Sequence, residues 1–337
     1  MHRYQLMGVP AACDGNRLQR ILRRNSISIK AYISIARPDH WTKNVFVLPG
    51  ALIPALFENI HFLDFAGNLV VGMISVCLVT SANYVLNEWL DAIFDRHHPI
   101  KQHRPSVSGN LVRWIVYTEY ALLAIVGLAV GAFVSVHFFC TALFLLIMGV
   151  IYNVKPFRTK DRAFLDVLTE SFNNPLRLAL GWFCVTSTPW PTSSLVVGYW
   201  MGGAFLMGMK RFAEYRLIND PKAAGNYRKS FRIYTEESLL ISSFFYAMFC
   251  ATLVGVFLVK YRVELLLFIP LLAALFAWYF HLAFLLNSPV QYPEKLHKQR
   301  GFMIYCASVG FVFVLLMIVD VEPLRWFLNR VFIVEQK

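Results

Sequence analysis

Long apolar runs separated by basic, polar segments are the feature of this 337-residue sequence that most constrains its fold. Hydrophobic residues make up 57% of the chain and charged residues only 15%, whereas an average soluble domain is roughly 25% charged. Most runs approach the ~20 residues that an α-helix needs to cross a bilayer. We therefore predict an all-α, polytopic membrane protein. The nine predicted spans are residues 42–58, 65–87, 112–134, 137–153, 164–186, 194–211, 238–259, 264–286 and 301–320.

The distribution of Lys and Arg predicts the orientation of these spans. Of the 32 basic residues, 26 fall on one side of the predicted membrane, which by the positive-inside rule is the cytoplasmic side. The net charge of +12 is thus explained by topology, and no nucleic-acid partner is expected. We predict a multi-pass protein of a bacterial inner membrane, with its N-terminus and its active site in the cytoplasm. Residues 1–29 are predicted to be a basic tail, partly disordered or on the membrane surface, 30–322 the transmembrane domain, and 323–337 a short C-terminal tail.

Cysteine and histidine patterns do not indicate a metal site with nitrogen or sulfur ligands. The six cysteines form no CxxC pair, and five of them lie inside apolar runs, which is typical of packing residues. The nine histidines form no HExxH motif. Metal chemistry, if present, is therefore expected to depend on oxygen ligands.

An acidic cluster at the cytoplasmic end of the second span predicts such a site. Asn87, Asp91 and Asp95 recur at every fourth residue, and Glu88 lies beside them. On a helix this spacing stacks the side chains on one face, where like charges repel by roughly 0.2–0.5 kcal/mol per pair. Acidic groups at a helix C-terminus also oppose the helix dipole. A divalent cation would offset both terms, so we predict a site for Mg²⁺, or alternatively Mn²⁺, completed by substrate phosphates.

The loop after this cluster carries basic residues that suit a diphosphate. Lys101 and Arg104 would neutralise charge on phosphate oxygens or on a leaving group. A positive-inside loop explains these two residues equally well. The acidic residues fit that simpler explanation poorly, so we favour a binding site.

A second cluster lies in the loop before the fifth span and in its first turns. It comprises Lys155, Arg158, Lys160, Asp161 and Arg162, and then Asp166, Glu170, Asn173, Asn174 and Arg177. Positions 166, 170, 173/174 and 177 form one predicted helical stripe. Asp166 lies near the N-terminus of that helix, where a simple cap is an alternative role. The deeper polar residues are costly in a membrane and normally face a bundle interior or cavity. If the second and fifth spans pack together, the two clusters can hold one diphosphate between them.

Three further cations are candidate phosphate ligands. Lys210 and Arg211 close the sixth span, where the helix dipole and the positive-inside rule also favour basic residues. Lys43 opens the first span, where its side chain would either bind phosphate or extend to the membrane surface.

With these motifs, the sequence from about residue 30 to 320 resembles the UbiA superfamily of intramembrane prenyltransferases. The motifs that carry the resemblance are Asn87-Glu88-x-x-Asp91-x-x-x-Asp95, Arg104-Pro105-x-x-x-Gly109 and Asp166-x-x-x-Glu170. Glu88 and Glu170 stand where the family usually has Asp. The resemblance implies nine helices around a central cavity capped on the cytoplasmic side, with prenyl diphosphate bound through Mg²⁺.

The resemblance also implies roles for individual residues. The acids Asp91, Asp95, Asp166 and Glu170 would be catalytic. The implied metal ligands are Asn87, Glu88, Asp91, Asp95, Asp166 and Glu170. The candidate diphosphate-binding residues are Asn87, Lys101, Arg104, Lys43, Lys155, Asn174, Arg177, Lys210 and Arg211.

The branch of the superfamily is left open by the sequence. Arg37-Pro38-x-x-Trp41-x-Lys43-Asn44 and Lys210-Arg211-x-Ala213-Glu214 resemble the branch that transfers phosphoribose from phosphoribosyl diphosphate to a polyprenyl phosphate. The stretch from Tyr152 to Asp166 resembles branches that prenylate carotenoids or aromatic rings. We expect a prenyltransferase acting on a lipid or aromatic acceptor, with phosphoribosyl transfer as the alternative.

Two other classes of function are weighed against the enzyme. A transporter or flippase would spread functional charges across the bilayer depth, often with an inverted repeat. Here the polar groups gather on one side and no repeat is evident. A non-catalytic scaffold would not need to keep both Asp91 and Asp95.

Overall fold

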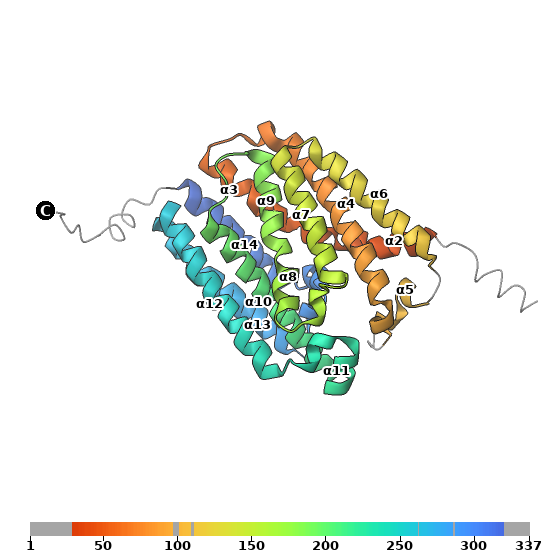
Figure 1. The fold of residues 1–337 in the computed structure, drawn as a ribbon. Helices are drawn as coiled ribbons and strands as arrows, with labels where there is room; N and C mark the ends of the chain where they lie inside the picture. Colours follow the sequence, from red (N-terminus) through yellow and green to blue (C-terminus); the bar gives the residue numbers. More distant parts are fainter. Residues whose placement is uncertain (1–28, 97–100, 109–110, 262, 286, 320–337) are drawn as a thin grey trace, which may run out of the picture.

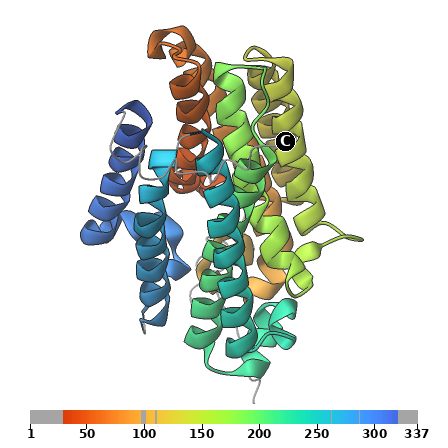
Figure 2. The ribbon, with the colours of Figure 1, turned by 90° about the vertical axis from the view of Figure 1, so that its left-hand side faces the viewer.

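The long helices of the protein run side by side in one bundle (Figures 1 and 2). The computed structural model describes residues 29–96, 101–108, 111–261, 263–285 and 287–319, and every regular element within them is helical, which confirms the all-α prediction. Most residues of the two predicted tails lie outside these ranges. The α-helices are α2 (Ile29–Ala36), α3 (Leu48–Phe57), α4 (Phe62–Asp95), α5 (Pro105–Ser108), α6 (Arg113–Ala132), α7 (Val136–Asn153), α8 (Leu165–Ser171), α9 (Asn173–Val185), α10 (Ser193–Ile218), α11 (Pro221–Tyr227), α12 (Glu236–Tyr261), α13 (Phe268–Phe284) and α14 (Arg300–Ile318). The 3₁₀ helices are η1 (Pro38–Val47), η2 (Lys101–His103), η3 (Thr159–Asp161), η4 (Lys229–Arg232), η5 (Val263–Leu267), η6 (Pro289–Gln291) and η7 (Pro293–Lys298).

Six of the described helices are long and apolar enough to cross a membrane, and the protein is an integral, multi-pass membrane protein. They coincide with predicted spans. The six are Phe62–Asp95, Arg113–Ala132, Val136–Asn153, Glu236–Tyr261, Glu264–Phe284 and Arg300–Ile318. The other three predicted spans, residues 42–58, 164–186 and 194–211, are not among these six helices. The count of nine crossings stays a prediction.

The first predicted span is divided between η1 and α3. Pro54 lies inside α3 and has no N–H for an intrahelical hydrogen bond, which keeps this helix short. The helix packs closely on α9 through two glycines. A Cβ on Gly50 would lie 1.9 Å from the carbonyl oxygen of Leu178, and one on Gly181 would lie 2.0 Å from that of Val47. Only glycine permits this approach of the two backbones.

The fifth predicted span is divided between α8 and α9. The interruption falls at Phe172, three residues before Pro175. Pro175 has no N–H to donate to the carbonyl oxygen of Ser171, so the helical ladder is broken there. The sixth span, by contrast, is the continuous helix α10, which extends seven residues beyond the predicted end at residue 211.

Several helix ends gather at one end of the bundle, the lower end in Figures 1 and 2. The chain leaves α4, α7 and α10 there and enters α8 there, and α11 covers the same end. Helix α10 packs along α12, α4 packs along α6, and α9 contacts both α4 and α7. This arrangement brings the ends of α4 and α8, where the two acidic motifs lie, to the same end of the molecule.

Candidate active site

A cavity of about 480 Å³ opens at this end of the bundle. Its described lining includes ten Lys or Arg residues and seven Asp or Glu residues, an excess of three positive charges. The cations are Arg37, Lys43, Lys101, Arg104, Arg158, Lys160, Lys210, Arg211, Arg228 and Lys229. The acids are Asp39, Glu88, Asp91, Asp95, Asp161, Glu170 and Glu214. Such a lining suits an anionic ligand of several charges.

One wall of the cavity is the last turns of α4. Asn87, Asp91 and Asp95 all line it, on three successive turns. The Asp91 carboxylate lies 2.5 Å from Lys160 Nζ, and the Asp95 carboxylate lies 2.5 Å from Arg104 Nη1. These cations offset the repulsion that the spacing of the acids creates.

The loop between α7 and α8 supplies the cations that face Asp91. Arg158 has a backbone φ of 31°, in the left-handed region. From there its guanidinium donates to the Asn153 carbonyl oxygen at 2.9 Å and to Asp91 Oδ1 at 3.1 Å. Lys160 donates to Asn153 Oδ1 at 2.6 Å. Burial lowers the pKa of Lys160 to about 8, and the neighbouring Asp91 carboxylate offsets only part of that effect.

Glu88 faces the opposite edge of the α4 wall, toward η1. Its Oε2 accepts hydrogen bonds from Nε and Nη2 of Arg37 at 2.9 and 2.8 Å, and the carboxylate is almost fully buried. On the same edge, Lys43 Nζ lies 2.9 Å from His40 Nδ1. Burial, and then the Lys43 and Arg37 charges, lower the pKa of His40 to about 2. His40 is therefore neutral and accepts the hydrogen bond from Lys43.

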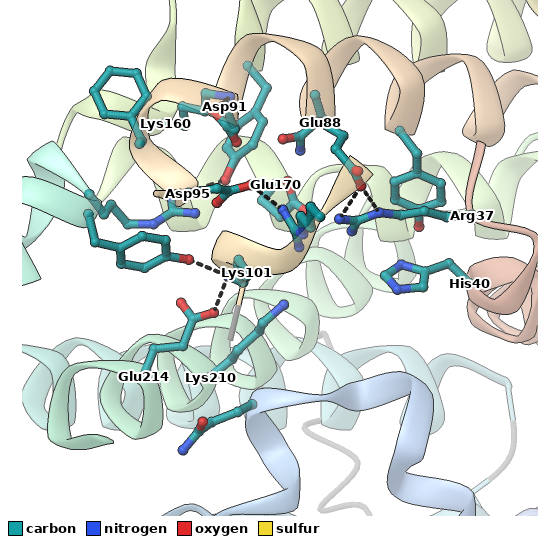
Figure 3. A pocket seen from close by; sticks show the side chains of 18 of the residues that line it. Arg37, His40, Glu88, Asp91, Asp95, Lys101, Lys160, Glu170, Lys210 and Glu214 are labelled. Atoms are coloured by element: carbon teal, nitrogen blue, oxygen red, sulfur yellow. Dashed lines mark hydrogen bonds and ion pairs between the residues drawn. The ribbon is translucent and has the colours of Figure 1, made fainter. Parts of the chain in front are cut away.

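The far wall comes from the last turns of α10 (Figure 3). Glu214 is buried and accepts from Lys101 at 3.2 Å and from Arg211 Nη1 at 2.9 Å. Although burial disfavours a charged Lys101, Glu214 and the phenol of Tyr227 keep its pKa above the ordinary value. Lys210 lines the cavity as well, and has no hydrogen-bond partner among the described residues.

The second acidic motif is divided between the cavity and the protein interior. Glu170 lines the cavity, and its carboxylate has no hydrogen-bond partner among the described residues. Asp166, one turn earlier, is fully buried behind the lining. Its carboxylate is held by Tyr234 at 2.7 Å and by Arg211 at 3.2 Å. The two acids of one motif thus have different surroundings.

Three other predicted site residues lie away from the cavity lining. Lys155 is exposed in the loop after α7. Asn174 packs against Gly203 on α10. Arg177 is buried within the bundle and donates to Asn44 Oδ1 at 3.2 Å. The remaining predicted residues, from Lys43 to Arg211, line the cavity.

Five cations of the lining were not among the diphosphate-binding residues predicted from the sequence. They are Arg37, Arg158 and Lys160, which pair with the α4 acids, Arg228, which contacts Tyr152, and Lys229, which pairs with Asp161. In the sequence they stand in basic segments that are predicted to be cytoplasmic, where the positive-inside rule already accounts for positive charge. The sequence feature that could have identified them is that most of them lie near the acidic motifs or the predicted basic motifs.

The oxygen donors of the lining fit a Mg²⁺ ion that binds together with a substrate. Within the described ranges, no three His, Cys, Asp or Glu side chains lie close enough to enclose a metal by themselves. Mg²⁺ does not require such a cage, since it is usually held by one or two carboxylates together with substrate phosphates. Asn87 and Glu170 face the cavity with no hydrogen-bond partner in the described part of the chain, and Asp91 and Asp95 add carboxylates.

Sequence comparison finds relatives of known name. A decaprenyl-phosphate phosphoribosyltransferase of Mycolicibacterium smegmatis is 29% identical over 216 residues, 63% of this chain and 64% of that protein. A decaprenyl-phosphate phosphoribosyltransferase of Corynebacterium glutamicum is 29% identical over 61% of this chain and 60% of its own length. The match to each therefore spans less than two thirds of the relative.

Structure comparison finds the same fold in solved proteins. A UbiA homologue from Archaeoglobus fulgidus, bound to GPP and Mg²⁺, superposes with a TM-score of 0.63 over 83% of this chain and 99% of its own, at 21% identity. The sequence profile of the UbiA prenyltransferase family matches residues 46–306, which include all the described helices from α3 to α13. This chain belongs to the UbiA prenyltransferase family.

Proposed function

We propose that this protein transfers a phosphoribosyl group from phosphoribosyl diphosphate to a polyprenyl phosphate at the membrane surface. The observation that carries the proposal is the cavity lining, in which ten cations surround a single hollow at the end of a membrane bundle. The relatives named decaprenyl-phosphate phosphoribosyltransferase support the same reaction.

The number and placement of the cations match several phosphate groups. A prenyl diphosphate carries one diphosphate, whereas the proposed pair of substrates carries a diphosphate, a sugar phosphate and a lipid phosphate. Arg158, Lys160 and Arg228 gather near Asp91. Lys43 and Lys210 lie near His40 on another side of the same cavity. Cations on separate sides can bind separate phosphates, because Lys and Arg each make charge-assisted hydrogen bonds to phosphate oxygens.

The proposed reaction is a substitution at the anomeric carbon of the ribose. The bond from C1 to the diphosphate oxygen breaks, and its electron pair leaves with pyrophosphate. An oxygen of the polyprenyl phosphate forms the new bond to C1, so the product is a phosphodiester and no proton transfer at carbon is needed. Lys101 and Arg104, which extend from the segment after α4, would stabilise charge on the departing pyrophosphate.

A divalent cation belongs to the same proposal. Asn87, Asp91, Asp95 and Glu170 would hold Mg²⁺, or alternatively Mn²⁺, together with the donor diphosphate. The chemistry that such an ion supplies is charge neutralisation of the diphosphate oxygens. The paired cations Arg104, Arg158 and Lys160 would then exchange part of their contact with the acids for contact with the phosphates.

Prenyl transfer is the second candidate, supported by the GPP-bound homologue of the same fold. Such a reaction benefits from aromatic faces that stabilise a carbocation. The rings of the cavity are largely engaged by the protein's own cations. Arg37 lies 6.0 Å from the Tyr84 ring, Arg158 lies 5.0 Å from the Phe94 ring, and Lys101 lies 4.7 Å from the Tyr227 ring. This pattern favours phosphate binding over stabilisation of a carbocation.

The orientation of the site is proposed from the charge distribution. The cavity lies at the end of the bundle where the basic loops gather, which the positive-inside rule places in the cytoplasm. A bacterial inner membrane would supply the polyprenyl lipid from within the bilayer and the soluble donor from the cytoplasm.

A substrate screen tests the proposal. Purified protein with Mg²⁺ would be given phosphoribosyl diphosphate and a polyprenyl phosphate, or prenyl diphosphates with aromatic acceptors. We expect lipid-linked phosphoribose and pyrophosphate from the first pair only. Product from the second pair alone would replace this proposal with prenyl transfer.

A further inference from the structure

The buried acid of the second motif contacts the cavity only through other side chains. Both oxygens of Asp166 accept hydrogen bonds. Oδ1 accepts from the Tyr234 hydroxyl at 2.7 Å, and Oδ2 accepts from Arg211 Nε and Ser230 Oγ, each at 3.2 Å. Arg228 Nη1 lies 3.6 Å from the same Oδ2. The side chain has no measurable solvent exposure.

The two arginines beside Asp166 form part of the cavity wall. Arg211 and Arg228 both line the cavity, and both donate to the Tyr152 hydroxyl, at 3.2 and 3.3 Å. Arg228 Nε is buried and has no hydrogen-bond partner among the described residues. A buried guanidinium N–H without a partner costs free energy, so this arginine gains from pairing with a water or an anionic ligand supplied by the adjoining cavity.

We propose that Asp166 is a positioning residue that fixes Arg211 and Arg228 as an anion-binding wall, and that it does not ligate the metal. The substrate phosphate would contact Arg228, whose orientation Asp166 and Tyr152 set. The proposal rests on the proposed function only in that the cavity binds a diphosphate group. It holds whether the donor is phosphoribosyl diphosphate or a prenyl diphosphate.

Geometry separates this role from metal ligation. Three hydrogen bonds already use most of the acceptor sites of the Asp166 carboxylate, and the side chain has no solvent exposure, so a metal would have to enter a closed, donor-filled position to reach it. It would also lie next to two guanidinium groups, which repel a divalent cation. Glu170, one turn later on α8, offers a carboxylate that faces the cavity and has no hydrogen-bond partner within the described segments.

The consequence is an asymmetric site. Oxygen ligands for a cation would come from α4 and Glu170, and guanidinium groups would come from α10 and the segment after α11. A diphosphate bound between them would contact metal on one side and arginine on the other. Part of its affinity would then persist without any metal.

Binding of inorganic pyrophosphate tests this division directly. Titration calorimetry in detergent would be done in EDTA and again with Mg²⁺, and Mn²⁺ affinity would be measured by electron paramagnetic resonance. We expect Asp166→Asn to weaken pyrophosphate binding in EDTA about tenfold or more, as truncation of a buried charge pair does. Its Mn²⁺ affinity should match that of the native protein, whereas Glu170→Gln should lower Mn²⁺ affinity. Glu237→Gln, on the exposed first turn of α12, is the matched control for loss of one acid.

A double variant of Arg228 and Asp166, and a milder variant of Tyr234, complete the test. Arg228→Gln should weaken metal-free binding by a similar factor, and adding Asp166→Asn to it should weaken binding little further. Tyr234→Phe keeps the ring but removes one donor to Asp166, so it should show a smaller loss in the same direction even if Asp166→Asn does not fold. Lower Mn²⁺ affinity in Asp166→Asn, with unchanged pyrophosphate binding in EDTA, would overturn the proposal. Neither measurement depends on which group the enzyme transfers.

Discussion

The two acidic motifs are similar in sequence but differ in their surroundings. On α4, Asn87, Asp91 and Asp95 all face the cavity, and each carboxylate is paired with a cation that a phosphate could recruit. On α8, only Glu170 faces the cavity, because Asp166 lies behind the lining. Acidic spacing of four residues therefore identifies a helix face, but the packing of that helix decides whether the face meets substrate.

The largest expected effect is on the α4 wall. Asp91→Asn should lower kcat/KM for pyrophosphate release by roughly 100- to 1,000-fold, because the metal and the orientation of Lys160 would both be lost. Steady-state assays with saturating Mg²⁺ check this. Asp64→Asn, on the exposed first turn of α4, serves as the control. Native activity in Asp91→Asn would contradict the assignment of Asp91 to the active site.

The next effect concerns the stability of the α10 wall. Glu214→Gln removes a buried carboxylate that accepts from Lys101 and Arg211, so the partly buried Lys101 loses its acid and the buried Arg211 keeps only Asp166 and Tyr152 as partners to its charge. A loss of about 3 kcal/mol in unfolding free energy is expected, as for other broken buried pairs. Thermal unfolding in detergent would measure the change. A second substitution, Lys101→Met, should recover part of the loss; no recovery would show that the pair is not coupled.

A pH effect is expected at the η1 edge. His40 has a pKa of about 2 in the folded protein, against an ordinary 6.5. Between these values the unfolded state binds more protons, so stability is full above pH 6.5 and falls as the pH drops. The loss between pH 7 and pH 5 should be on the order of 2 kcal/mol. His40→Asn should flatten this dependence, and an unchanged slope in that variant would assign the effect to other groups.

The smallest expected effect is on Lys210, a cation of the α10 wall that has no hydrogen-bond partner among the described residues. Lys210→Met should weaken binding of the phosphate-bearing substrates roughly fivefold, about 1 kcal/mol, because one charge-assisted contact is lost. The change should appear in KM and leave kcat nearly intact, since Lys210 is proposed to bind in the ground state as well. Lys155→Met, on an exposed loop residue, should leave KM unchanged. Equal effects in the two variants would argue against a local contact.

The sequence predicted the class of fold and much of the cavity. Apolar runs gave the membrane helices, and the motif around Asp91 gave one wall of the cavity. The same reasoning placed Asp166, Asn174 and Arg177 on one stripe toward the cavity, and in the structure these three lie behind or away from it. A helical stripe is wide, and rotation of the helix cannot be read from spacing alone. Pro175 also breaks the helix between the first of these residues and the last.

By itself, the sequence determined that this chain is a helical membrane protein with acids and bases concentrated at one end. It did so because hydrophobic length and charge placement act locally, through the transfer of each segment into lipid. Only the tertiary structure decided which acids and cations share a cavity. Arg158 meets Asp91 across 67 residues, and Arg211 meets Asp166 across 45. Those pairings depend on how α4, α8 and α10 pack, which no local property of the chain specifies.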